Sequence, residues 1–89
     1  MHFCEKDIFH QAQSGNIEAF ERLTEAYHRK VFGMALNITG DRREASRLAQ
    51  EVFIRVFRSM EHLDNERLLP VYIYKKFSEV CMMTQCVRI

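Results

Sequence analysis

Apolar residues recur at intervals of three and four along two stretches in the middle of the chain. This spacing places them on one face of a helix and predicts amphipathic helices over 17–39 and 42–60. Between the two helices, Gly40 reads as a left-handed helix stop, and Asp41 with Glu44 reads as a capping box. Such a short connection makes the helices antiparallel neighbours. The predicted buried positions are Phe20, Leu23, Tyr27, Val31, Met34, Ala35 and Ile38 in the first helix, and Ala45, Leu48, Ala49, Val52, Phe53 and Val56 in the second.

Shorter elements flank this pair. A helix is predicted over 7–13, closed by a Ser-Gly-Asn turn, and the aperiodic stretch 61–69 is predicted to be a loop. Pro70 suits the first turn of a last helix over 70–86, although the β-branched and aromatic residues at 71–74 leave a strand open. On this helix Tyr74, Phe77, Val80, Cys81 and Thr84 are expected to face inward, and Tyr72, Lys75, Lys76 and Glu79 outward. The predicted fold class is all-α, a compact bundle of three to four helices.

Composition sets limits on this picture. The chain has 89 residues, of which 47% are hydrophobic and 28% charged, and this balance predicts one folded domain over residues 1–89. The formal net charge is only +1, so attraction to nucleic acid must come from a local cluster of Lys and Arg. No apolar run approaches the length of a membrane span, and the first residues do not resemble a signal peptide. We therefore expect a cytoplasmic protein with no membrane partner.

The residues that commonly carry chemistry are scattered. The three cysteines and four histidines show no pairing with the spacing of a zinc site, and an odd number of cysteines does not indicate a disulfide framework. Phosphate-binding glycine loops and the usual hydrolase motifs do not occur in the sequence. We therefore expect a binding protein, with no catalytic residue, no metal and no cofactor.

The stretch from Asp7 to Arg58 resembles a known family. The residues that carry the likeness are Asp7, Ala12, Gly15, Ala19-Phe20, Leu23, Tyr27, Val31 and Ala35, then Gly40-Asp41, Ala45, Leu48-Ala49-Gln50-Glu51-Val52-Phe53, and Arg55 to Arg58. This pattern is similar to conserved region 2 of extracytoplasmic-function (ECF) sigma factors, which direct bacterial RNA polymerase to promoters. Beyond Met60 the likeness rests on Tyr72-Ile73-Tyr74-Lys75, where the family usually has Trp-Leu-Tyr-Arg/Lys.

The resemblance implies a polymerase-docking surface. In the family, the helix holding the Gln-Glu pair docks on a coiled coil of the largest subunit of core RNA polymerase. This role falls on Gln50 and Glu51, with Arg47, Ile54 and Arg58 beside them. Gln50 can donate and accept hydrogen bonds, and an exposed Ile54 can serve as an apolar anchor. From spacing alone, Glu51 and Arg55 also fit an ordinary surface ion pair.

The resemblance also implies promoter binding. The family's loop before the last helix holds a base flipped out of the single-stranded −10 element, and the last helix faces the adjoining duplex. The corresponding DNA-binding residues are His62, Asn65 and Arg67 in the loop, and Tyr72, Lys75 and Lys76 in the helix. A base stacked on an aromatic ring recovers about 1–3 kcal/mol of the lost stacking. The alternative interpretation is that Tyr72 and Tyr74 both belong to the core.

Two departures from the family pattern leave a second function open. Ser46-Arg47 stands where the family is typically acidic, and the second helical domain, region 4 with its helix-turn-helix, is not found in the sequence. The chain is thus expected to be either a fragment or a natural short protein. The first hypothesis is a transcription initiation module that docks on polymerase and melts the −10 element. The alternative is a protein-interaction module, a decoy or a domain held by an anti-sigma factor, without specific DNA binding.

Overall fold

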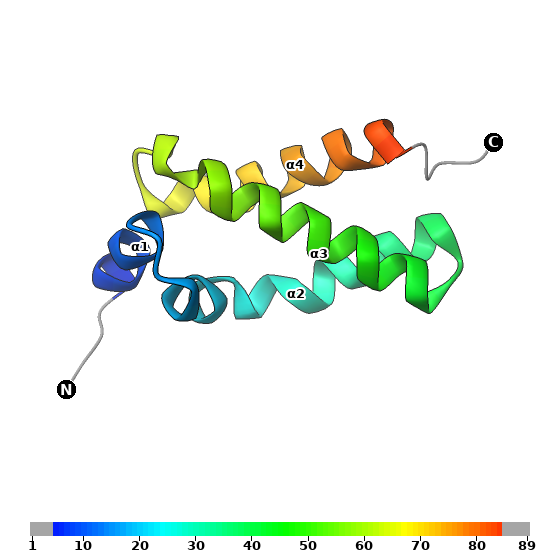
Figure 1. Cartoon of the computed structure of the whole chain (residues 1–89), viewed down its shortest axis with the longest axis horizontal. Coiled ribbons are helices and arrows are strands. Elements are labelled where there is room, and N and C mark those ends of the chain that lie inside the picture. The colour runs from blue at the N-terminus through cyan, green and yellow to red at the C-terminus, as the bar shows by residue number, and fades with distance from the viewer. Residues whose placement is uncertain (1–4, 85–89) are drawn as a thin grey trace.

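The computed structural model describes residues 5–84, and the regular elements in that range are all helices joined by short turns (Figure 1). Its elements are α1 (Glu5–Gln13), α2 (Ile17–Thr39), α3 (Arg42–Ser59), the 3₁₀ turns η1 (Met60–His62) and η2 (Glu66–Leu68), and α4 (Leu69–Thr84). The predicted all-α bundle is confirmed. The strand left open at 71–74 is instead part of α4.

The corner between α2 and α3 is built by local capping. Gly40 adopts a left-handed φ of 69°, and its N–H donates to the Leu36 carbonyl at 2.8 Å. The Asp41 carboxylate accepts from the backbone N–H groups of Arg43 and Glu44 at 2.8 and 3.3 Å. The return half of the predicted capping box does not form, because the Asp41 N–H donates to Thr39 Oγ1 instead. The side chain of Glu44 pairs with Arg47 at 3.7 Å.

Helix α3 lies between α2 and α4, so it buries apolar residues on two sides (Figure 1). Phe20 of α2 packs against Phe53 and Phe57 of α3, with ring centroids 6.5 and 4.9 Å apart. Thr24, a buried polar residue, satisfies its hydroxyl by donating to the Phe20 carbonyl at 2.8 Å. All six positions predicted for the buried stripe of α3 are buried: Ala45, Leu48, Ala49, Val52, Phe53 and Val56.

The predicted register of α4 is wrong at its start. Leu69 and Ile73 are buried, and with Phe77, Val80 and Cys81 they define the inward stripe at helical spacing. Tyr74, which was expected inward, lies about 100° around the helix from Ile73 and is 43% exposed. Tyr72, which was expected outward, is half-buried against the core. Residues 85–86 and the side chain of Thr84 lie outside the described residues.

A side chain from α1 fastens the segment between α3 and α4. Gln13 Nε2 donates to the carbonyl oxygens of Met60 and Leu63 at 3.0 and 2.9 Å. Within the segment, the Asn65 side chain accepts from the Arg67 N–H at 2.8 Å and starts η2. The predicted loop is therefore a pair of short turns attached to α1. Over residues 5–84, no helix combines the length and apolarity that crossing a membrane requires.

Candidate functional site

The exposed side of α3 is the first candidate site. Successive steps of three and four place Arg47, Gln50, Ile54 and Arg58 along one edge, and all four are exposed. Ile54 is 46% exposed, although it lies in the middle of a helix that is otherwise well packed. The core makes little use of this edge, and among its side chains Arg47 forms an exposed ion pair with Glu44.

Glu51 lies on a different edge of the same helix. Gln50 lines an apolar groove between α2 and α3, whereas Glu51 and Arg47 line a hollow between α3 and α4. The Glu51 carboxylate accepts from Arg55 Nε at 2.8 Å, so the surface ion pair considered from the spacing does form. The five residues predicted for polymerase docking therefore lie within an arc of about 100° of α3, with Gln50 on its α2 side and Glu51 on its α4 side.

The segment 63–68 forms the second candidate site together with α1 and α2. An open cavity of about 820 Å³ lies between them, and the polar residues that the segment contributes to its lining are Asp64, Asn65, Glu66 and Arg67. His62 is exposed but does not line this cavity. His10 and Tyr27 contribute rings to it from α1 and α2. Sequence periodicity gave no signal for these two rings as site residues, because their convergence depends on how α1 and α2 pack.

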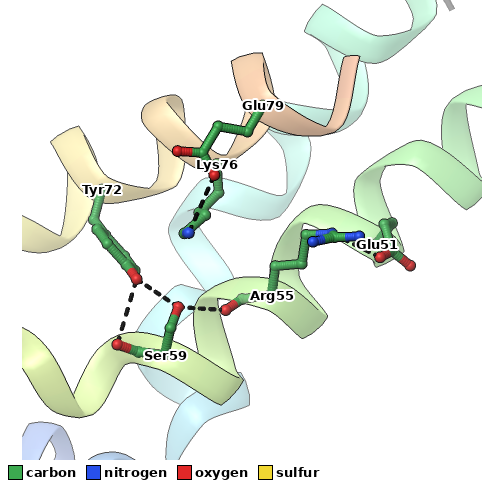
Figure 2. Close-up of polar contacts among 6 residues, drawn as sticks. All are labelled: Glu51, Arg55, Ser59, Tyr72, Lys76 and Glu79. Carbon is green, nitrogen blue, oxygen red and sulfur yellow. Dashed lines mark hydrogen bonds and ion pairs between the residues drawn. The ribbon is translucent and has the colours of Figure 1, made fainter. Parts of the chain in front are cut away.

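Tyr72 and Lys76 are structural in this arrangement. Figure 2 shows Tyr72 reaching from α4 to Ser59 at the end of α3, where its hydroxyl donates to the Ser59 hydroxyl and, at 3.3 Å, to the Ser59 carbonyl. The side chain of Lys76 is only 20% exposed, lies 5.3 Å from the Tyr72 ring centroid and pairs with Glu79 at 3.1 Å. The expectation that Tyr72 and Lys76 are outward-facing is therefore corrected. Among the predicted α4 contacts, Lys75 is the exposed one.

Tyr72→Phe is expected to lower the free energy of unfolding by about 1 kcal/mol, because it removes a partly buried hydrogen-bond donor that joins α3 to α4. Urea unfolding followed by circular dichroism would measure this change. Tyr74→Phe is the matched control. The Tyr74 side chain is exposed, so loss of its hydroxyl should leave the free energy of unfolding unchanged. Equal stability of the two variants would show that the Tyr72 hydroxyl contributes nothing.

The described part of the chain shows no cluster of residues suited to binding a metal ion. Nowhere in residues 5–84 do three or more His, Cys, Asp or Glu side chains gather in a way that could hold a metal ion. The prediction that the protein uses no metal or cofactor remains a prediction.

Comparison with known proteins identifies the family of this chain. The model of sigma-70 region 2 matches residues 23–75, more than half of the chain, and this range includes both the exposed edges of α3 and the segment leading into α4. The chain belongs to the sigma-70 region 2 family. The resemblance predicted from the sequence is thereby confirmed.

Two curated relatives of this region 2 chain are sigma factors. The RNA polymerase sigma-H factor of Pseudomonas aeruginosa is 25% identical over 71 residues, which cover 80% of this chain and 37% of that protein. The ECF RNA polymerase sigma factor SigW of Bacillus subtilis is 28% identical over 65 residues, which cover 73% of this chain and 35% of that protein. The chain thus spans little more than a third of the length of these relatives. No solved structure matches it significantly.

Proposed function

We propose that this region 2 chain is a transcription initiation module that docks on core RNA polymerase through α3 and contacts the −10 promoter element through the 63–68 segment and α4. The observation that carries the docking proposal is the exposed edge of α3. Helix α3 buries its apolar stripe on both sides, yet it presents Ile54 to solvent between Gln50 and Arg58. Exposed apolar residues flanked by polar ones are typical of the central anchor of a protein interface.

The cavity beside the 63–68 segment supports the DNA part of the proposal. Its volume of about 820 Å³ falls within the range of roughly 300–1,000 Å³ typical of small-molecule sites, so a single unstacked base would fit. Asn65 can donate and accept hydrogen bonds at a base edge, and Arg67 can contact a phosphate. Tyr27 supplies an aromatic ring in the same cavity. These groups are suited to a flipped base in single-stranded DNA.

The outer surface of α4 offers a second DNA contact next to the cavity. Tyr74 and Lys75 are adjacent and exposed; Lys75 is one of the residues predicted from the sequence to bind DNA, and Tyr74 takes the place predicted for Tyr72. A tyrosine ring can stack on a base while the neighbouring ammonium group contacts a phosphate. We propose that Tyr74 and Lys75 contact the promoter, while Tyr72 and Lys76 hold α4 in position.

The function is tested by mixing the purified chain with core RNA polymerase from Bacillus subtilis or Pseudomonas aeruginosa, the organisms of the two relatives, and following co-elution on a sizing column. Stable co-elution is the expected result. A chain shown to be folded by circular dichroism that elutes alone from both polymerases would contradict the docking proposal.

Lys75→Gln is expected to weaken binding to a single-stranded −10 oligonucleotide and to reduce the slope of log affinity against log salt by about 0.7, the contribution of one lost phosphate contact to a single strand. Fluorescence anisotropy at several salt concentrations measures both quantities. Lys76→Gln is the matched control, because Lys76 is paired with Glu79 and should change the slope less. A larger effect for Lys76→Gln would reverse the assignment of the two lysines.

A specific observation also favours the alternative, a protein-interaction module without specific DNA binding. Two of the six residues predicted to bind DNA, Tyr72 and Lys76, are engaged in contacts within the bundle. The oligonucleotide experiment discriminates between the two functions. Co-elution with polymerase and no detectable DNA binding would support the alternative.

A further inference from the structure

Exposed apolar side chains in the described part of the chain gather on α4 and the turn before it. Of the seven large hydrophobic residues exposed there, five lie between Leu68 and Met83. Two of these are adjacent methionines near the end of α4: Met82 is 79% exposed and Met83 is 59% exposed. Met60, by contrast, is fully buried. Reagents dissolved in water therefore reach Met82 and Met83 far more easily than Met60.

The two adjacent methionines have different surroundings. Met83 lines the hollow between α3 and α4 together with Leu48 and Val80, whereas Met82 lies outside it. This difference follows from the turn of about 100° between successive residues of a helix. A chemical change at Met83 therefore acts on a surface shared by two helices, while the same change at Met82 acts in solvent.

The charged residues that line this hollow all belong to α3: Glu44, Arg47, Glu51 and Arg55. Their charges balance, and each arginine pairs with one glutamate. Arg55 Nε lies 2.8 Å from the Glu51 carboxylate (Figure 2), whereas the Arg47 guanidinium lies 3.7 Å from Glu44, beyond hydrogen-bonding distance. A guanidinium has five N–H donors, so each arginine can donate to a further acceptor beside its glutamate.

We propose that Met83 is an oxidation site at the polymerase-docking surface, and that hydrogen peroxide converts its thioether to the sulfoxide. The sulfur lone pair attacks one oxygen of the peroxide, whose O–O bond breaks as an S–O bond forms. The transferred oxygen passes its proton to the departing hydroxide, which leaves as water. Sulfur is oxidised and the peroxide is reduced, and methionine sulfoxide reductases can reverse the change.

The product differs from the thioether in the property that matters for docking. Methionine is an exposed apolar side chain that a protein partner can cover, whereas a sulfoxide oxygen is a polar acceptor that must be desolvated. Arg47 and Arg55 line the same hollow and can donate to this oxygen. The inference rests on the proposed docking function, because Glu51 of the docking surface lines the hollow as well. It adds regulation: oxidation of Met83 weakens docking, and reduction restores it.

The variants Met82→Leu and Met83→Leu form a matched pair for the test. Leucine replaces methionine with little change in volume and cannot form a sulfoxide, so each variant keeps one of the two exposed sulfurs. Mass spectrometry of the unchanged chain after peroxide treatment should show faster oxidation at Met82 and Met83 than at Met60. Oxidation of Met83 no faster than that of Met60 would contradict the proposal.

Peroxide treatment should lower the affinity of Met82→Leu for core polymerase roughly fivefold or more, as expected when one interface contact is disturbed. The affinity of Met83→Leu should stay within about twofold, and a methionine sulfoxide reductase should restore that of Met82→Leu. The other methionines and the cysteines are common to both variants, so their oxidation affects both equally. Circular dichroism at the assay temperature checks that both oxidised variants are folded. Equal losses in the two variants would overturn the inference.

The melting temperature separates this inference from the proposed function. The sulfoxide of Met83 places a polar oxygen beside Leu48 and Val80, so oxidation should lower the melting temperature of Met82→Leu more than that of Met83→Leu. If the unoxidised chain does not bind polymerase, the docking proposal fails, and this comparison alone decides: equal shifts would rule out Met83 as the sensitive site. If polymerase binds the oxidised and unoxidised chains equally well, docking stands and the inference is lost.

Discussion

Replacement of Ile54 by aspartate is expected to lower the affinity of the chain for core RNA polymerase at least about thirtyfold, because truncation of an interface anchor commonly costs about 2 kcal/mol or more. Ile54 is nearly half exposed, so the change should leave the fold intact. In the bound state a carboxylate would replace an apolar contact and would be desolvated without a partner. Titration of labelled chain with core polymerase gives the two dissociation constants.

Val71→Asp controls for the chemistry of this change. Val71 is 68% exposed on α4, away from the edge of α3, so its replacement should leave the polymerase affinity unchanged. Both variants should keep the helical circular dichroism of the original chain. If Ile54→Asp binds polymerase as tightly as the unchanged chain, the exposed edge of α3 is not the docking surface.

Gln50→Ala and Glu51→Lys then locate the contact on the helix. The two residues point about 100° apart, Gln50 toward the groove with α2 and Glu51 toward the hollow with α4. If only Gln50→Ala weakens binding, polymerase lies over the α2 side of α3. If only Glu51→Lys does so, polymerase lies over the α4 side. The Glu51 carboxylate must then either leave Arg55 on docking or bind Arg55 and the partner together.

The second large effect is expected from Gln13→Glu, which should lower the free energy of unfolding by about 2 kcal/mol. Gln13 donates to two carbonyl oxygens of the segment after α3, those of Met60 and Leu63. A carboxylate has no hydrogen to donate, so the substitution removes both bonds and places a negative charge against two acceptors. Urea unfolding of the two chains measures the loss.

The same variant should weaken binding to the single-stranded −10 oligonucleotide, because Gln13 holds the segment that forms one wall of the cavity. Gln11→Glu is the matched control: it makes the same change in α1 at a residue that lines a pocket with the start of α2. A Gln13→Glu chain that loses stability but binds the oligonucleotide normally would show that the cavity does not depend on this attachment. Equal stability losses for the two variants would show that the bonds to Met60 and Leu63 are unimportant.

A nearly neutral chain can still bind DNA if short-range contacts replace long-range attraction. With a net charge of +1, long-range attraction is weak, so affinity must arise from short-range contacts. The bundle separates its candidate contacts in space. The 63–68 segment and Tyr74 lie toward one end of α3, and Arg42, Arg43 and Arg47 lie toward its other end.

The sequence by itself determined the two central helices and their corner. Helical periodicity and the glycine–aspartate pair at 40–41 are local signals, so they predict α2 and α3 without knowledge of what packs on them. The buried stripe of α3 followed from the same periodicity. Family membership was also visible in the sequence, because the motif residues are concentrated in this continuous stretch.

The tertiary structure alone decided the register of α4 and the composition of the site. The short and strongly apolar sequence of α4 allows more than one inward face, and it is the packing of Leu69 and Ile73 on α3 that turns Tyr72 inward and Tyr74 outward. The attachment by Gln13 and the cavity beside the 63–68 segment join residues from α1, α2 and the turns. Their positions depend on long-range packing, which local periodicity does not encode.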